Sequence, residues 1–213
     1  MVKVILFDFW GTLVEQGVWS PVKQVRNVLN LTMPFSEYII RMEKAMMTSK
    51  FENLSDSFKA ICQEFNIESD EKKIETLVGL WNKSWMLAEP YPEMINSLKE
   101  LKDKGYVLVL IANSDPFSVE NVLNKFSMNE LFDHKYLSYQ TGKIKSDPNS
   151  FRRIMQDLQI MPEDCVMVGD GIQSDIIPAK SVGIKAVLVD RRNTRDFHPK
   201  IKNLEELEKV LSI

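Results

Sequence analysis

The sequence predicts an α/β protein: a three-layer core built on a parallel sheet, with an all-helical segment inserted near the N-terminus. From about residue 92 onward, short apolar runs rich in β-branched residues alternate with amphipathic helical patterns. This alternation is typical of a parallel sheet that helices cover on both faces. Between Val14 and Glu89 the sequence instead shows no convincing strand and several amphipathic helical patterns, which predicts the insertion.

Apolar runs with the length and composition of buried strands occur at Val2–Phe7, Tyr106–Ala112, Cys165–Val168, Ile184–Val189 and, as the weakest, Tyr136–Tyr139. Helical patterns separate these strands at Pro92–Lys104, Phe117–Phe126, Ser150–Leu158 and Pro178–Val182. Asp-Pro pairs before two of these helices and a glycine after the two others are the expected start and stop signals. Strands that alternate with helices along the chain predict a parallel sheet.

The inserted segment is expected to contain four helices, at residues 21–31, Phe35–Ser49, Ser55–Phe65 and Asp70–Leu87. Because a loop between a strand and a helix usually takes about 2–6 residues, a stretch of about 75 residues predicts a unit of its own. We therefore expect residues 14–90 to form a helical cap domain on a core made of residues 1–13 and 91–213.

Composition excludes several classes of function. The 213 residues carry a net charge of −3 with both signs interleaved, so no nucleic-acid partner is expected. No apolar run approaches the roughly 20 residues of a membrane span, and Asp8 interrupts the N-terminal run before it reaches signal-peptide length. Cys62 and Cys165 lie far apart without metal-binding spacing, which is typical of a reduced, cytoplasmic protein. We expect a monomer or a homodimer.

Polar residues follow three of the predicted strands at the point where each strand ends. Asp8 follows the first, Asn113 and Ser114 follow the second, and Asp170 follows a later one, with Asp175 further on. Ligands of parallel α/β sheets bind beyond the carboxyl ends of the strands. Each group taken singly is equally well explained as a turn or a helix cap. Three such groups in succession favour one functional site.

Three segments resemble motifs of the haloacid dehalogenase superfamily. Asp8-Phe-Trp-Gly-Thr-Leu is similar to the first motif, in which a nucleophilic aspartate follows a strand and precedes Gly-Thr. Gly142-Lys-Ile-Lys145-Ser-Asp-Pro148 is similar to the third motif, and Gly169-Asp170-Gly-Ile-Gln-Ser-Asp175 is similar to the fourth. Their order and spacing agree from residue 1 to residue 191. The resemblance implies a hydrolase with a Rossmann-like core and a cap after the first motif.

The resemblance also implies a role for individual residues. Asp8 would be the nucleophile that forms a covalent intermediate, which water then hydrolyses. Lys145 would neutralise Asp8 and the anionic group of a small-molecule substrate. Asn113 and Ser114 would bind phosphate oxygens.

A magnesium site is implied by the same motifs. Asp8, Asp170 and the backbone carbonyl of Trp10 would hold Mg²⁺, which prefers oxygen ligands, and Asp175 would act as a ligand through water or support the other ligands. Trp10 would also border the substrate. The family's phosphatases carry a second aspartate at this position as general acid and base, and Trp10 has no such group to offer.

This departure leaves alternatives open. The intact acidic motif favours a Mg²⁺-dependent phosphatase acting on a small phosphorylated metabolite. Trp10 favours a metal-independent 2-haloacid dehalogenase, because a halide leaves as an anion without a proton. Phosphonate hydrolysis would need a particular cap lysine, which nothing in the sequence singles out. A metal- or phosphate-binding module with little or no turnover is the remaining possibility.

Overall fold

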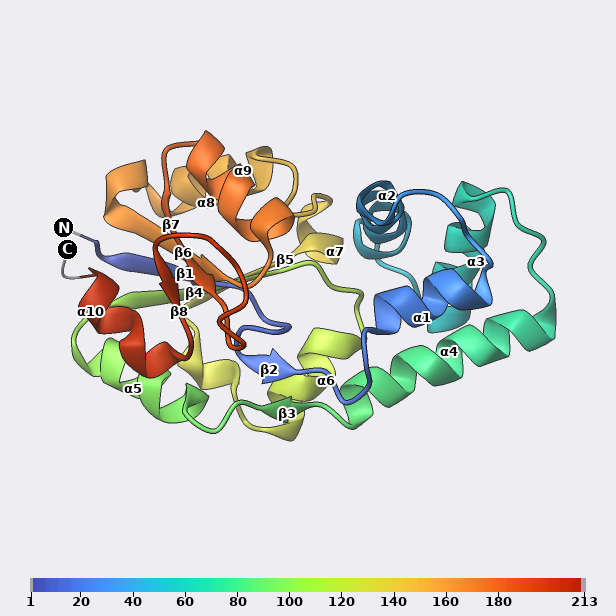
Figure 1. The fold of residues 1–213 in the computed structure, drawn as a ribbon, viewed down its shortest axis with the longest axis horizontal. Helices are drawn as coiled ribbons and strands as arrows, with labels where there is room; N and C mark the ends of the chain where they lie inside the picture. Colours follow the sequence, from blue (N-terminus) through green and yellow to red (C-terminus); the bar gives the residue numbers. More distant parts are fainter. Residues whose placement is uncertain (1, 212–213) are drawn as a thin grey trace.

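Residues 2–211, which the computed structural model describes, contain a six-stranded sheet at the centre of the core (Figure 1). Its strands are β1 (Val4–Phe7), β4 (Val107–Ala112), β5 (His134–Leu137), β6 (Cys165–Gly169), β7 (Lys185–Val189) and β8 (Lys200–Ile201). They lie in the order β5-β4-β1-β6-β7-β8, and every neighbouring pair is parallel. The predicted parallel α/β fold is therefore confirmed.

Helices cover both faces of the sheet, so the core has three layers. On one face lie α5 (Met94–Asp103), α6 (Ser118–Lys125) and α10 (Leu207–Leu211), and on the other lie α8 (Asn149–Leu158) and α9 (Ile177–Ser181). Alternate side chains of β1 point to opposite faces of the sheet. Ile5 and Phe7 pack with α5, α6 and α10, and Val4 and Leu6 pack with α8 and α9. Short helical turns complete the core at Asn129–Leu131, Ser138–Thr141 (α7), Pro162–Asp164, Ile172–Ile176 and Leu204–Glu206.

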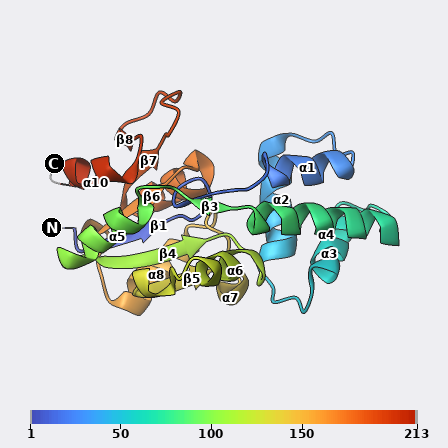
Figure 2. The same ribbon diagram turned by 90° about the horizontal axis from the view of Figure 1, so that it is seen from below.

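The helical segment, residues 16–88, lies beside the core (Figures 1 and 2). Its helices are α1 (Pro21–Val28), α2 (Phe35–Met47), α3 (Leu54–Glu64) and α4 (Glu71–Met86). They pack around their own cluster of buried side chains, which includes Tyr38, Met42, Phe58, Leu77 and Trp81. The side chains of Asn53 and Asp70 cap the N-termini of α3 and α4, as such residues commonly do.

Two short strands join this segment to the core, and they correct the prediction that Val14–Glu89 holds no strand. β2 (Val14–Glu15) pairs antiparallel with β3 (Glu89–Pro90). A ladder of two residues is too short to leave an alternating pattern in the sequence. The prediction for Tyr136–Tyr139 was also wrong in part, since β5 ends at Leu137 and α7 begins at Ser138.

At Ser138, where β5 ends, the side chain forms hydrogen bonds to the backbone of Ser114. Its hydroxyl accepts a hydrogen bond from the backbone N–H of Ser114 (2.9 Å) and donates one to the Ser114 carbonyl (3.2 Å). β5 is thereby tied to the end of β4.

Among the described residues, no helix combines the length and the apolar composition that a membrane span requires.

Candidate active site

Asp8 lies at the carboxyl end of β1, between β4 and β6. Its backbone N–H donates to the carbonyl of Val168 (2.9 Å), which continues the ladder with β6. The Thr12 hydroxyl donates to Oδ2 of Asp8 (3.0 Å), and the Lys145 ammonium pairs with Oδ1. Only 6% of Asp8 is exposed. The sequence analysis assigned no role to Thr12, although it belongs to the first motif.

Lys145 follows α7 on a loop that brings it back over the sheet. Its backbone N–H donates to Oδ1 of Asn113 (2.8 Å), and its ammonium pairs with Asp8 and with Asp175 (2.6 Å). Burial alone lowers the pKa of Lys145, but the carboxylates of Asp175 and Asp8 outweigh burial and raise it above its usual value. Lys145 is therefore a fixed positive charge, and it is 4% exposed.

The carboxylates of Asp8, Asp170 and Asp175 form one cluster. One oxygen from each lies within 4.8 Å of the others. Burial is the main cause of the raised pKa of Asp170, and the charges of Asp8 and Asp175 add to it. Burial and the charge of Asp8 also raise the pKa of Asp175, although Lys145 opposes this rise. Like charges at this separation repel unless protons or a cation neutralise them.

Asp170 and Asp175 are held differently. Oδ2 of Asp175 accepts a hydrogen bond from the Gly171 N–H (2.8 Å), whereas the Asp170 side chain has no hydrogen-bond donor within residues 2–211. The Arg195 guanidinium donates to the backbone carbonyl of Asp170. A carboxylate that takes part in a cluster but lacks a donor fits a cation ligand, so these residues suit the Mg²⁺ that the family resemblance implies.

Two glycines allow the carboxylates to approach the backbone so closely. Gly11 has a φ of +79°, and a Cβ built on it would lie 2.6 Å from Oδ2 of Asp170. A Cβ on Gly169 would lie 2.6 Å from Cγ of Asp175. A side chain at either position would push a carboxylate out of the cluster.

Asn113 and Ser114, predicted to bind phosphate, follow β4 and are both buried. The Asn113 side chain bridges Lys145 to Glu43 of α2, where its Nδ2 lies 2.7 Å from Oε2 of Glu43. The Ser114 hydroxyl donates to the Asp115 carbonyl (2.6 Å), and the Ser114 backbone N–H donates to the Ser138 hydroxyl. The phosphate-binding roles of Asn113 and Ser114 stay predictions.

Trp10 lies in the turn after Asp8 and is half-buried. Its ring packs edge-on against Phe9 at 4.9 Å between centroids. The roles predicted for its carbonyl as a metal ligand and for its side chain beside the substrate stay predictions. The indole carries no group that can exchange a proton with a substrate near neutral pH.

Glu43 is a second group at this site, besides Thr12, that the sequence analysis missed. It lies on α2 in the helical segment, 70 residues from its partner Asn113. Nothing in the local sequence distinguishes it from Glu37 or Lys44 on the same helix. Only the packing of α2 against the core brings its carboxylate to the site.

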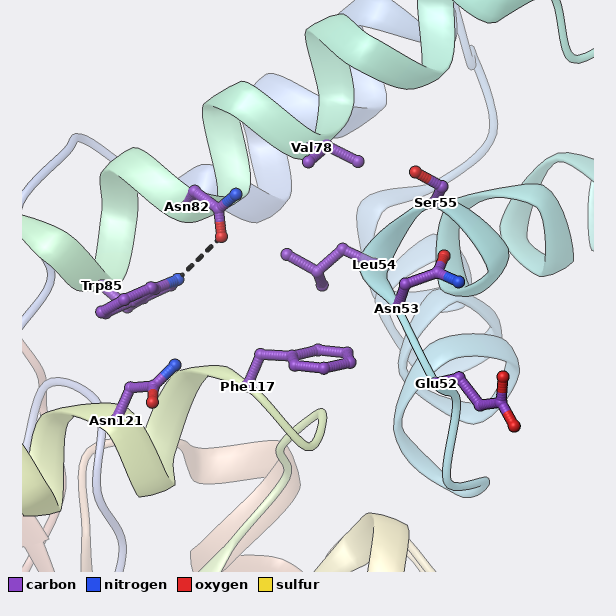
Figure 3. A pocket seen from close by; sticks show the side chains of 9 residues that line it. All are labelled: Glu52, Asn53, Leu54, Ser55, Val78, Asn82, Trp85, Phe117 and Asn121. Carbon is purple, nitrogen blue, oxygen red and sulfur yellow. Dashed lines mark hydrogen bonds between the residues drawn. The ribbon is translucent and has the colours of Figure 1, made fainter.

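A separate cavity of about 310 Å³ lies where α3 and α4 meet α6 (Figure 3). Leu54, Val78 and Phe117 line it together with polar side chains, and the Trp85 indole N–H donates to Asn82 there (3.0 Å). None of the predicted site residues lines this cavity. It belongs to the junction between the helical segment and the core.

Known proteins resemble this chain in sequence and in fold. A family model for haloacid dehalogenase-like hydrolases matches residues 2–183. A glyceraldehyde 3-phosphate phosphatase from Pyrococcus furiosus is 25% identical over 191 residues, which cover 87% of this chain and 80% of that protein.

Two solved structures show the same fold over the full chain. A HAD phosphatase from Thermococcus onnurineus is 25% identical with a TM-score of 0.65, covering 99% of this chain and 98% of that one. The L-2-haloacid dehalogenase from Xanthobacter autotrophicus is 18% identical with a TM-score of 0.65, covering 100% and 99%.

The fold and the acidic site at the end of β1 thus define a hydrolase class. The chain belongs to the haloacid dehalogenase-like hydrolases. The predicted family and the predicted hydrolase activity are confirmed.

Proposed function

We propose that this protein is a Mg²⁺-dependent phosphatase that hydrolyses phosphate esters of small metabolites, with Asp8 as nucleophile. The carboxylate cluster of Asp8, Asp170 and Asp175, with the buried ammonium of Lys145, carries this proposal. One ammonium leaves three carboxylates with excess negative charge. An anionic phosphate approaches such a cluster only if a cation neutralises it.

In this proposal each residue of the site has a distinct role. Asp8, Asp170 and the carbonyl of Trp10 would hold Mg²⁺, and Asp175 would act through water or support these ligands. The ion would offset negative charge on the phosphate and on the carboxylates. The Thr12 hydroxyl holds one oxygen of Asp8 and leaves the carboxylate oriented for attack on phosphorus. The Lys145 ammonium pairs with Asp8 and would attract the phosphoryl oxygens.

We further propose that residues 14–90 are a cap domain, on a core of residues 1–13 and 91–213. The pairing of β2 with β3 lies where the chain leaves and rejoins the core, and the two units have separate clusters of buried side chains. Asp8 and Asp175 are almost fully covered, at 6% and 1% exposure. Substrate access therefore requires the cap to move, as lids of many hydrolases do.

The substrate class rests on chemistry at the site and on relatives. Similar proteins carry the names glyceraldehyde 3-phosphate phosphatase and pyrophosphatase, and both names describe enzymes for small phosphorylated compounds. A cavity of about 230 Å³ lies between α2 and residues 142–147, and Lys44, Lys143 and Asp147 are among the residues that line it. The location that fits two free, buried cysteines is the cytoplasm. The oligomeric state, a monomer or a homodimer, stays a prediction.

Hydrolysis of p-nitrophenyl phosphate tests the proposal. We expect turnover with Mg²⁺, none with EDTA, and a loss of at least about 10³-fold in Asp8→Asn, since the covalent step depends on that carboxylate. Asp56→Asn is the control, because Asp56 lies on the exposed surface of α3. Activity that persists in Asp8→Asn would contradict the proposal.

Dehalogenation is the second candidate, and Trp10 is the observation that favours it, because a departing halide needs no proton. Release of chloride from 2-chloropropionate in the presence of EDTA would establish this activity instead. Mg²⁺ binding without turnover of either substrate would identify a binding module.

A further inference from the structure

Glu43 is a carboxylate from the helical segment that reaches the core at the end of β4. Its Oε2 lies 2.7 Å from Nδ2 of Asn113. The Asn113 amide cannot turn around, because its Oδ1 accepts the backbone N–H of Lys145 (2.8 Å). The Asn113 side chain therefore links the Glu43 carboxylate to the backbone of Lys145.

The surroundings of Glu43 favour the protonated form of its carboxyl group. Removal of the carboxylate from water raises the pKa of Glu43 to about 7, and the charges of Asp175 and Asp8 add to this rise. Lys145 and the Asn113 amide act in the opposite direction and only partly offset it. Near neutral pH the side chain is present in both protonation states, which suits a group that gives and takes protons.

Hydrolysis of an alkyl phosphate requires such a group. The departing alkoxide is a strong base, so a proton delivered to it in the transition state accelerates the reaction by about 10²–10⁴-fold. Trp10 supplies no proton, and Lys145 holds its own between two carboxylates. Asp170 and Asp175 are committed to the cation in the proposed function. Glu43 is the carboxyl near the nucleophile that these roles leave unused.

We propose that Glu43, carried by the cap helix α2, is the general acid and base of the reaction. This proposal rests on the phosphatase function proposed above. As an oxygen of Asp8 attacks phosphorus and the ester P–O bond breaks, the Glu43 carboxyl transfers its proton to the leaving oxygen, which departs as an alcohol. The Glu43 carboxylate then takes a proton from the water that attacks the aspartyl phosphate. Phosphate leaves, and Asp8 and the protonated Glu43 are restored.

The assignment couples chemistry to closure of the cap. With α2 against the core, the proton carrier sits at the site, and with α2 displaced it is absent. Acid–base chemistry then occurs only when the site is closed over a substrate, which limits loss of the intermediate to bulk water.

A leaving-group comparison tests the proposal. Glu43→Gln keeps the shape and can still accept from Asn113, but it has no acidic proton. We expect kcat/KM for ethyl phosphate to fall at least about 100-fold. For p-nitrophenyl phosphate, whose phenolate leaves as a stable anion, we expect a change of less than about threefold. Glu37→Gln is the matched control on the exposed side of α2, and it should alter neither value.

An equal loss on both substrates would assign Glu43 a merely structural role and overturn the proposal, as would an unchanged rate on ethyl phosphate. A wild-type chain that hydrolyses neither ester would overturn the phosphatase function itself, and this assignment with it. A wild-type chain that hydrolyses both, with equal losses in Glu43→Gln, would leave that function standing.

A second measurement uses the wild-type protein and does not depend on the folding of a variant. The ratio of kcat/KM for ethyl phosphate to that for p-nitrophenyl phosphate cancels ionisations that affect both substrates. We expect this ratio to fall about tenfold for each pH unit above about 7, as Glu43 loses its proton. A ratio that stays flat from pH 6 to pH 9 would overturn the proposal.

Discussion

The ammonium nitrogen of Lys145 lies 2.6 Å from Oδ1 of Asp175 and also pairs with Asp8. Lys145→Met removes the cation and leaves two buried carboxylates facing each other. Breaking a buried ion pair at one partner costs about 3–5 kcal/mol. We expect the free energy of unfolding of the metal-free protein to fall by about 3 kcal/mol, measured by urea denaturation.

Lys143→Met is the matched control for that prediction. Lys143 is two residues away, half-exposed, and pairs with Asp147 at 3.6 Å on the surface. Such pairs contribute about 0–1 kcal/mol, so Lys143→Met should leave stability nearly unchanged. Equal losses in the two variants would contradict the structural role assigned to Lys145.

The stability of the metal-free protein should decrease as pH rises. Burial and the charges of Asp8 and Asp175 raise the pKa of Asp170 to about 7, from about 4 in an unfolded chain. Between these values the folded state binds more protons than the unfolded state, so the stabilisation is fully present below pH 4 and is lost as pH rises through 7. We expect a lower Tm at pH 8 than at pH 5 in EDTA, measured by calorimetry.

Saturating Mg²⁺ should reduce this difference, because the cation replaces the protons as the partner of the carboxylates. The Asp170→Asn variant should show a smaller decrease of Tm with pH than the wild type. A Tm that rises from pH 5 to pH 8 without metal would contradict the charge repulsion described for this cluster.

Gly11→Ala should destabilise the protein and weaken Mg²⁺ binding. The φ of +79° costs a side-chain-bearing residue about 1–2 kcal/mol, and the new Cβ would displace the Asp170 carboxylate. Gly79→Ala, in the exposed middle of α4 with nothing within 4 Å of the new Cβ, should instead stabilise by about 0.5–1 kcal/mol. Urea denaturation and calorimetric titration with Mg²⁺ measure both effects. Unchanged metal affinity in Gly11→Ala would show that Asp170 is not a ligand.

Trp81→Phe should loosen the junction between the helical segment and the core. The Trp81 indole N–H donates to Oδ2 of Asp115 (2.9 Å), and Asp115 in turn accepts from the first N–H groups of α6. Loss of a buried hydrogen bond to a charged group costs about 1.5–3 kcal/mol. Trp85→Phe removes only a bond within α4 and should cost less than about 1 kcal/mol. Hydrogen exchange at the α6 amides distinguishes the two variants, and equal exchange would contradict this bridge.

Much of the core could be predicted because its signals are local. β1, β4, β6 and β7 lie within two residues of their predicted bounds, since buried parallel strands form continuous apolar runs. β2 and β3 were missed because their pairing joins residues far apart and spans only two positions on each strand. The end of β5 was misplaced because hydrogen bonds between Ser138 and Ser114 set it.

The sequence alone determined that Asp8, Asp170 and Asp175 would gather at one edge of the sheet, because parallel strands present their carboxyl ends on the same side. The tertiary structure alone decided that Glu43 joins them. Its position depends on how α2 packs against the core and on the orientation of the Asn113 amide. A motif encodes groups carried by neighbouring strands, whereas a contact between separately packed units leaves no spacing in the sequence to detect.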